Sequence, residues 1–220
     1  MKYIFFDLDG TLLNTRDGIV KSIQKTIASS GIIIDDLCLL EKHIGPPMRD
    51  TLIECYGFDE RTAILKVEEY RKHYKELGIP GTKPYDGVEE GLKALKMQGY
   101  SLCVATSKPE HIAKEFLDYF QLSKYFEHIC GSIEDGSKVR DTKGKVIRYA
   151  LETMHLKDSD DVIMIGDRSH DVEGSLENGI ECIGVLYGFG SKKELLDAGA
   201  IHVFKDFKEL VEHLLKENSQ

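Results

Sequence analysis

Five short runs of apolar residues constrain the fold of this chain more than any other feature of its sequence. Apolarity within each run is continuous and does not alternate, and the runs lie at residues 3–6, 102–105, 162–165, 182–185 and 202–204. Continuous apolarity is typical of strands covered on both faces, as in a parallel sheet. Residues with helical spacing, such as Val88, Leu92 and Leu95, lie between most of the runs. This alternation predicts an α/β fold, a doubly wound parallel sheet of the Rossmann-like type.

The interval from residue 15 to residue 84 has a different pattern. It contains helical stripes and no convincing strand; Ile19, Ile23 and Ile27 form one stripe, and another runs from Ile64 to Tyr74. A Gly- and Pro-bearing stretch at 81–87 looks like the linker that returns the chain to the sheet. We therefore expect an α/β core made of residues 1–14 plus 85–220, and an inserted all-helical domain made of residues 15–84.

The composition argues against some classes of function. Of the 220 residues, 41% are hydrophobic and 30% are charged, as in an ordinary globular protein. The formal net charge of -9 argues against nucleic acid as a partner, because sequence-independent binding needs a surplus of Lys and Arg. A small anionic substrate stays possible, because a bound divalent cation can invert the local field.

The cysteines and the apolar segments bear on where such a chain resides. Its five cysteines are an odd number without a Cys-x-x-Cys pair, so neither a disulfide framework nor a structural zinc site is expected. Reduced thiols are typical of the cytoplasm. Without a recognisable leader or an apolar segment of about 18 residues, we predict a cytoplasmic protein with no membrane partner. Monomer and homodimer are both left open.

The strongest local signal is Asp7-Leu8-Asp9-Gly10, directly after the first apolar run. Ligands of open α/β sheets collect at the carboxyl ends of strands. Two carboxylates two residues apart point the same way in an extended chain, and could act as nucleophile and general acid/base. Gly10 lets the backbone turn tightly and approach a ligand. The alternative is a plain acidic turn.

A second pair of carboxylates, Asp167 and Asp171, follows the run at 162–165. Mg²⁺ prefers a few carboxylate oxygens and keeps several waters. Asp7 and Asp167 could supply such oxygens, with Asp171 tightening the shell around them. The alternative is an ordinary capped helix start. His170 lies inside this motif, but a hard cation prefers oxygen, so we expect a surface or packing histidine.

Other polar residues lie where a phosphate could bind. Thr106 and Ser107 follow the second apolar run, where a hydroxyl and free backbone amides at a helix start suit a phosphate oxygen. The alternative is an ordinary helix N-cap. Three lysines precede the helical stripe at 146–151. One of them could neutralise a phosphate and the attacking carboxylate, the alternative being solvated surface charges: Lys138, Lys143 and Lys145.

Taken together, these residues resemble the motifs of the haloacid dehalogenase superfamily of phosphohydrolases. Four segments are similar to its first, second, third and fourth motifs, in this order: Phe5-Phe6-Asp7-Leu8-Asp9-Gly10-Thr11-Leu12, Val104-Ala105-Thr106, Lys143 and Gly166-Asp167-Arg168-Ser169-His170-Asp171. The resemblance spans almost the whole chain, because the insertion at 15–84 matches the helical cap domain of that family.

The resemblance implies a role for each of these residues. Asp7 is then the nucleophile and a ligand of the cofactor, Mg²⁺. Asp9 protonates the leaving oxygen and later activates water, while its backbone carbonyl binds the metal. Phosphate is then bound by Gly10, Thr106, Ser107 and Lys143. Mg²⁺ is also held by Asp167 and Asp171.

Asp9 narrows the reaction that the resemblance implies. Dehalogenase-type members lack an acid at this position, so we expect a phosphatase, closest to the phosphoglycolate-phosphatase-like branch. The expected substrate is a small phosphorylated metabolite, such as phosphoglycolate or a nucleoside monophosphate. The alternatives are a pyrophosphatase, a phosphomutase acting on a sugar phosphate, and a sensor that binds a phosphorylated ligand without turnover.

Two further features carry less weight. Arg49 follows a Gly- and Pro-bearing loop of the insertion, a kind of loop that caps of this family often place over the active site. It could bind a second anionic group of the substrate, the alternative being a surface arginine at a helix start. Gly188-Phe189-Gly190 lacks the third glycine of a dinucleotide-binding motif and is not assigned to a ligand.

Overall fold

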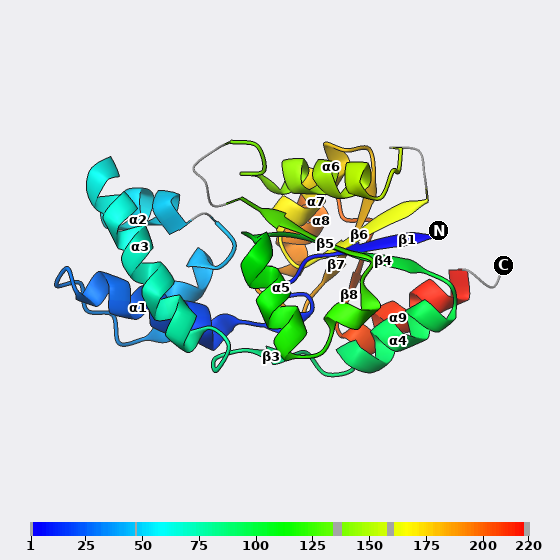
Figure 1. Cartoon of the computed structure of the whole chain (residues 1–220), viewed down its shortest axis with the longest axis horizontal. Coiled ribbons are helices and arrows are strands. Elements are labelled where there is room, and N and C mark those ends of the chain that lie inside the picture. The colour runs from blue at the N-terminus through cyan, green and yellow to red at the C-terminus, as the bar shows by residue number, and fades with distance from the viewer. Residues whose placement is uncertain (1, 47, 134–137, 158–160, 218–220) are drawn as a thin grey trace. The chain divides into compact units, whose positions relative to one another are not determined.

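The computed structural model describes residues 2–46, 48–133, 138–157 and 161–217 (Figure 1). The chain divides into two compact units, one made of Met1–Leu13 and Pro84–Gln220 and the other of Asn14–Lys83. The first unit contains a parallel sheet and the second is mainly helical. Within the described ranges, no helix combines the length and the apolarity that crossing a membrane requires.

The first unit is built around a six-stranded parallel sheet with the strand order β5-β4-β1-β6-β7-β8. The predicted fold class is confirmed, and all five apolar runs lie in strands of this sheet. From β1 the chain extends the sheet on one side through β4 and β5, and then on the other side through β6, β7 and β8. The strands are β1 (Tyr3–Phe6), β4 (Ser101–Pro109), β5 (His128–Ser132), β6 (Val162–Gly166), β7 (Glu181–Val185) and β8 (His202–Phe204).

Strand β5 was not predicted from the sequence. Its five residues include His128, Gly131 and Ser132, so it lacks the continuous apolarity of the other strands. β5 lies at the edge of the sheet and pairs only with β4 among the strands described, and its burial is incomplete. An edge strand needs less apolar surface than a central one, which explains why the apolar pattern did not reveal it.

Helices cover both faces of the sheet (Figure 1). One face is covered by three helices that also contact one another: α6 (Lys143–Thr153), α7 (Ser169–Leu176) and α8 (Lys192–Ala198). The other face carries α4 (Val88–Met97), α5 (Glu110–Tyr119), the short helix η2 (Ser123–Tyr125) and α9 (Phe207–Glu217). This layering is that of a doubly wound sheet.

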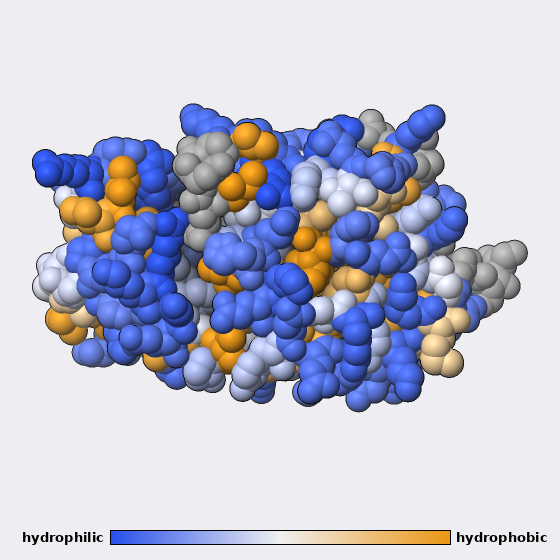
Figure 2. Space-filling model, in the orientation of Figure 1, coloured by the Kyte–Doolittle hydropathy of each residue, from blue (hydrophilic) through white to orange (hydrophobic). Residues whose placement is uncertain are grey.

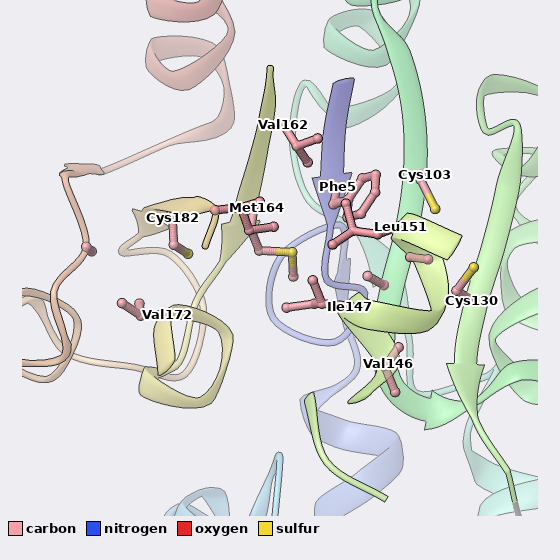
Figure 3. Close-up of a cluster of buried hydrophobic side chains, with 14 of the residues drawn as sticks. Phe5, Cys103, Cys130, Val146, Ile147, Leu151, Val162, Met164, Val172 and Cys182 are labelled. Atoms are coloured by element: carbon pink, nitrogen blue, oxygen red, sulfur yellow. The ribbon is translucent and has the colours of Figure 1, made fainter. Parts of the chain in front are cut away.

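A buried apolar cluster joins the sheet to α6 and α7 (Figure 3). Phe5 of β1 and Met164 of β6 pack with Ile147 and Leu151 of α6, and Val172 of α7 belongs to the same cluster. Burying one such side chain contributes about 1.5–3 kcal/mol. The cluster therefore fixes the central strands, and with them the residues that directly follow their carboxyl ends.

The second unit contains four helices among its described residues. They are α1 (Arg16–Ala28), the 3₁₀ helix η1 (Leu37–His43), α2 (Met48–Tyr56) and α3 (Glu60–Leu77). Where the chain passes between the units, β2 (Leu13–Asn14) and β3 (Lys83–Pro84) pair as a two-stranded sheet.

One predicted stripe of this unit is confirmed and the other is partly wrong. Ile19, Ile23 and Ile27 of α1 are buried, as expected. On α3 the buried residues are Ala63 and Tyr74, whereas Ile64 is half exposed. The predicted stripe therefore fails at Ile64, whereas Tyr74 at its other end is buried and Val67 and Tyr70 between them are partly buried. The surface of the second unit shows hydrophobic residues, among them Ile64 and Leu65, between the hydrophilic ones (Figure 2).

Candidate active site

Three neighbouring strands bring predicted site residues to one edge of the sheet. Asp7 directly follows β1, Thr106 lies near the carboxyl end of β4, and Asp167 directly follows β6. Both β4 and β6 pair with β1 in parallel register, so their carboxyl ends meet beside Asp7. This edge adjoins the point where the strand order reverses, the usual place for a ligand in an open α/β sheet.

Three carboxylates converge there. Asp7, Asp167 and Asp171 are buried, and one oxygen of each lies within 4.8 Å of one oxygen of the other two. Asp171 reaches the group from the first turn of α7, where its Oδ2 accepts hydrogen bonds from the amides of Asp167 and Arg168, each at 3.1 Å. We call these three carboxylates the carboxylate cluster.

Burial makes the negative charge of the carboxylate cluster costly. It raises the pKa of Asp167 well above the ordinary value, and the charges of Asp171 and Asp7 raise this pKa further. Burial also raises the pKa of Asp171, although the nearby ammonium of Lys143 opposes that shift. A divalent cation among the three would relieve both desolvation and repulsion, and hard oxygen donors suit Mg²⁺, so this donor set fits the metal.

Lys143 is the first residue of α6 and contacts the carboxylate cluster directly. Its Nζ lies 2.7 Å from Oδ1 of Asp7 and 2.8 Å from Oδ1 of Asp171, and it donates to the carbonyl of Ala105 at 3.2 Å. Burial acts to lower the pKa of Lys143, but the charges of Asp171 and Asp7 outweigh it and raise this pKa. Lys143 is therefore held as a cation beside Asp7.

The other two candidate lysines lie elsewhere. Lys145 is half exposed, and its Nζ is 2.7 Å from an oxygen of Asp141 and 2.7 Å from the carbonyl oxygen of Lys138. The side chain of Lys138 is exposed. Residues two apart on a helix point about 200° away from each other, so α6 can direct Lys143 or Lys145 to the sheet, but not both. The structure brings Lys143 to Asp7.

Thr106 and Ser107 differ from the sequence expectation in their local structure. Thr106 is buried, and its Oγ1 accepts a hydrogen bond from the amide of Lys108 at 3.3 Å, whereas Ser107 is exposed. Thr106 lies within the strand and not at a helix start, because β4 continues to Pro109 and α5 begins only at Glu110. A residue that precedes proline is disfavoured in helical conformation, which accounts for the later start.

Gly10 occupies a position that suits glycine alone. Its φ is +88°, in the left-handed region, and a side chain there would also collide with the carboxylate of Asp167. The hydroxyl of the next residue, Thr11, donates to Oδ1 of Asp167 at 3.2 Å. The turn after β1 thus packs directly on the carboxylate cluster. The role of Gly10 in binding phosphate stays a prediction.

The loop after β7 completes the surroundings of Asp167. The amide of Phe189 donates to Oδ2 of Asp167 at 2.7 Å. Gly188 and Gly190 lie so close to Asp167 that a side chain at either position would collide with it. The sequence analysis left this segment unassigned. Its glycines serve close packing against Asp167, and a backbone donor leaves no side-chain signal in a sequence.

Asp9 has a buried partner that the sequence analysis also missed. Nζ of Lys108 lies 2.7 Å from Oδ2 and 3.0 Å from Oδ1 of Asp9. The side chain of Lys108 is 4% exposed and that of Asp9 is 19% exposed. The only sequence signal was a lysine two residues after Thr106, and many lysines in this chain lie on the surface.

Two further residues considered in the sequence analysis have contacts within their own units. Arg49 belongs to the helical unit, where its half-exposed side chain forms ion pairs with Asp50 and Glu60. His170 is exposed on α7, with its Nδ1 3.9 Å from an oxygen of Glu173. The expectation of a surface histidine is confirmed.

Comparison with known proteins identifies the family. Residues 4–185 match the family model described as haloacid dehalogenase-like hydrolase. The chain belongs to the haloacid dehalogenase-like hydrolases. The predicted family membership is thereby confirmed, and the matched range includes the carboxylate cluster, Lys143 and the pair formed by Asp9 and Lys108.

Similar proteins support membership in this hydrolase family over nearly the whole chain. A 5'-nucleotidase of Pseudomonas aeruginosa is 42% identical over 94% of this chain and 92% of its own length. A protein of Mycobacterium tuberculosis named tyrosine-protein kinase PtkA is 36% identical over 85% of this chain and 62% of its own length. The crystal structure of a predicted phosphatase from Clostridium acetobutylicum has a TM-score of 0.92 and 46% identity, covering 98% of each chain. The predicted enzyme class, a phosphatase of this hydrolase family, is confirmed.

Proposed function

We propose that this haloacid dehalogenase-like hydrolase is a magnesium-dependent phosphatase that hydrolyses a small phosphomonoester through a phosphoryl intermediate on Asp7. One observation carries the proposal. Asp7 is buried 2.7 Å from the ammonium of Lys143, and its carboxylate converges with those of Asp167 and Asp171. This arrangement supports the assignment of a nucleophile, a cation and a set of metal ligands to one point.

In the first step an oxygen of Asp7 attacks phosphorus, and the bond between phosphorus and the ester oxygen breaks. A carboxylate that approaches a phosphate meets charge repulsion, which the ammonium of Lys143 reduces. Asp9 gives its proton to the departing oxygen, which leaves as an alcohol. Asp7, Asp167 and Asp171 would hold Mg²⁺, whose positive charge would offset the charge of the phosphoryl group.

In the second step water attacks the phosphorus of the aspartyl phosphate. Asp9 accepts a proton from this water, inorganic phosphate leaves, and the carboxylate of Asp7 is restored. We propose that Gly10, Thr106 and Ser107 hold the phosphate oxygens in both steps. Two easier displacements thereby replace one difficult hydrolysis, as in other covalent catalysis.

The proposed substrate is a small phosphorylated metabolite, with nucleoside monophosphates and phosphoglycolate as the leading candidates. The similarity to a 5'-nucleotidase supports the first of these. Residues 15–84 as a cap domain, and Arg49 as a residue that binds the substrate, stay predictions.

A panel of phosphorylated metabolites tests this function. It contains nucleoside monophosphates, phosphoglycolate, a sugar phosphate, pyrophosphate and p-nitrophenyl phosphate, each assayed for released phosphate with Mg²⁺ and with a chelator. We expect Mg²⁺ to raise the rate with at least one monoester by about 10²-fold or more. The outcome that contradicts the proposal is phosphoryl transfer to a hydroxyl in place of phosphate release. A coupled isomerase assay and an assay with ATP and a tyrosine peptide detect such transfer.

A further inference from the structure

Lys108 and Asp9 form a further, largely buried pair of opposite charges at this edge of the sheet. The first pair, Lys143 and Asp7, joins α6 to the residue after β1. The second joins the carboxyl end of β4 to the turn after β1, and Nζ of Lys108 contacts both oxygens of Asp9. Asp7 and Asp9, the two carboxylates that react in the proposed mechanism, therefore contact different lysines.

The backbone around Lys108 is shaped to direct this lysine inward. The register between β4 and β5 shifts between Thr106 and Pro109, an irregularity of the kind that re-aims side chains beside active sites. The neighbouring strand has Gly131 at this level, where a side chain would come within about 2.5 Å of the carbonyl oxygen of Lys108. The amide of Lys108 donates to Thr106, which ties the bulged segment to the strand.

The ammonium of Lys108 also lies near an aromatic ring. Its Nζ lies 4.9 Å from the ring centroid of Phe116 on α5, a favourable cation–π distance. The contacts of the ammonium with this ring and with both oxygens of Asp9 restrict its movement. A lysine fixed in this way restricts the rotation of the carboxylate that it contacts.

A general acid must lie within hydrogen-bond reach of the oxygen that it protonates, so the orientation of Asp9 matters as much as its presence. We infer that Lys108 is a positioning residue, which holds the carboxylate of Asp9 in the orientation needed for both proton transfers. This inference rests on the proposed function, because the two proton transfers of Asp9 belong to the hydrolysis of a phosphate ester.

Dependence on the leaving group distinguishes this role from a structural one. An alkyl ester needs a proton on its leaving oxygen, whereas p-nitrophenolate leaves without one. Lys108→Met keeps an unbranched side chain, one atom shorter than lysine, but removes the charged ammonium. We expect kcat with an alkyl monoester to fall about 10- to 100-fold, with KM changed less than about twofold.

The two proton transfers make a second readout possible. With p-nitrophenyl phosphate, Lys108→Met should release the first equivalent of nitrophenolate at close to the wild-type rate. Decay of the aspartyl phosphate still needs Asp9, so the release should appear as a burst followed by a slow steady state. Lys114→Met, an exposed change on α5 where Lys114 pairs with Asp118, is the matched control and should show neither effect.

Two further variants keep the test decisive. Lys108→Arg, which can contact both oxygens of a carboxylate, should recover much of kcat with the alkyl ester. Asp9→Asn combined with Lys108→Met should be no slower than Asp9→Asn alone, because Lys108 acts through Asp9. Equal losses with both esters and no burst, a loss confined to KM, or additive effects in the double variant would overturn the inference. If the wild-type protein releases no phosphate from any ester, the proposed function fails instead.

Discussion

Asp7→Asn is expected to lower kcat by at least about 10³-fold while the protein stays folded. Asparagine matches the size of the carboxylate, but its amide is not a nucleophile toward phosphorus, so the first displacement stops. Steady-state release of phosphate from the best substrate of the panel measures the loss.

The fold should tolerate this change because the buried carboxylates of the carboxylate cluster repel one another. The charge of Asp7 helps to raise the pKa of both Asp167 and Asp171, so removing it relieves repulsion. Lys143 keeps its ion pair with Asp171 at 2.8 Å. Without metal, Asp7→Asn should therefore unfold at a temperature no lower than that of the wild-type protein, as measured by circular dichroism.

A surface substitution provides the control for Asp7→Asn. Asp197→Asn makes the same chemical change on α8, where Asp197 is exposed and pairs with Lys193, and it should keep full activity. If Asp7→Asn stays folded and retains more than about a tenth of the wild-type kcat, Asp7 is not the nucleophile.

Mg²⁺ is expected to stabilise the wild-type protein against heat, and Asp167→Asn to abolish this effect. A ligand at 100 times its Kd stabilises the folded state by about 2.7 kcal/mol, or about 5–10 °C for a chain of this size. Asparagine can still accept from the amide of Phe189 and contact the hydroxyl of Thr11, so the variant should fold. Thermal unfolding with and without Mg²⁺ measures the difference, and activity should fall with it.

The stability of the metal-free protein should depend on pH through the same residue. Folded Asp167 keeps its proton to a higher pH than it does in the unfolded chain, because its pKa is raised from 3.8. The stability that this provides is present below the ordinary value and is lost as pH rises through the raised value. The metal-free wild-type protein should lose stability across that window, and metal-free Asp167→Asn should lose less.

Either of two results would contradict the metal site. One is a wild-type unfolding temperature that does not respond to Mg²⁺, and the other is an equally strong response in Asp167→Asn. Asp197→Asn serves again as the control and should respond to Mg²⁺ as the wild-type protein does.

The central part of the fold could be predicted because burial on two faces leaves a strong pattern in the sequence. Strands such as β1 and β6 must be apolar at every position, and both were located. Where fewer contacts constrain the chain, the pattern weakens. The edge strand β5 was missed, and Ile64, predicted to lie on the buried face of α3, is half exposed.

The residues of the candidate site also differ in how clear a pattern they leave in the sequence. Asp7 and Asp167 were recognisable because each directly follows a buried strand, and parallel pairing then brings them together. Spacing alone could not choose Lys143 over Lys145; the family resemblance selected Lys143, and the phase of α6 brings it to Asp7. The contact between Lys108 and Asp9 depends on a bulge in β4, and the contact of Phe189 depends on a backbone amide. Neither feature has a side-chain pattern that a sequence can show.

The most direct measurement is a rapid acid quench during turnover, followed by peptide mass spectrometry. If Asp7 attacks phosphorus, a phosphoryl group should be found on Asp7, form and decay at rates that account for turnover, and be absent from Asp7→Asn. A phosphoryl group on a different residue, or complete turnover in which no phosphorylated protein ever forms, would contradict the central claim.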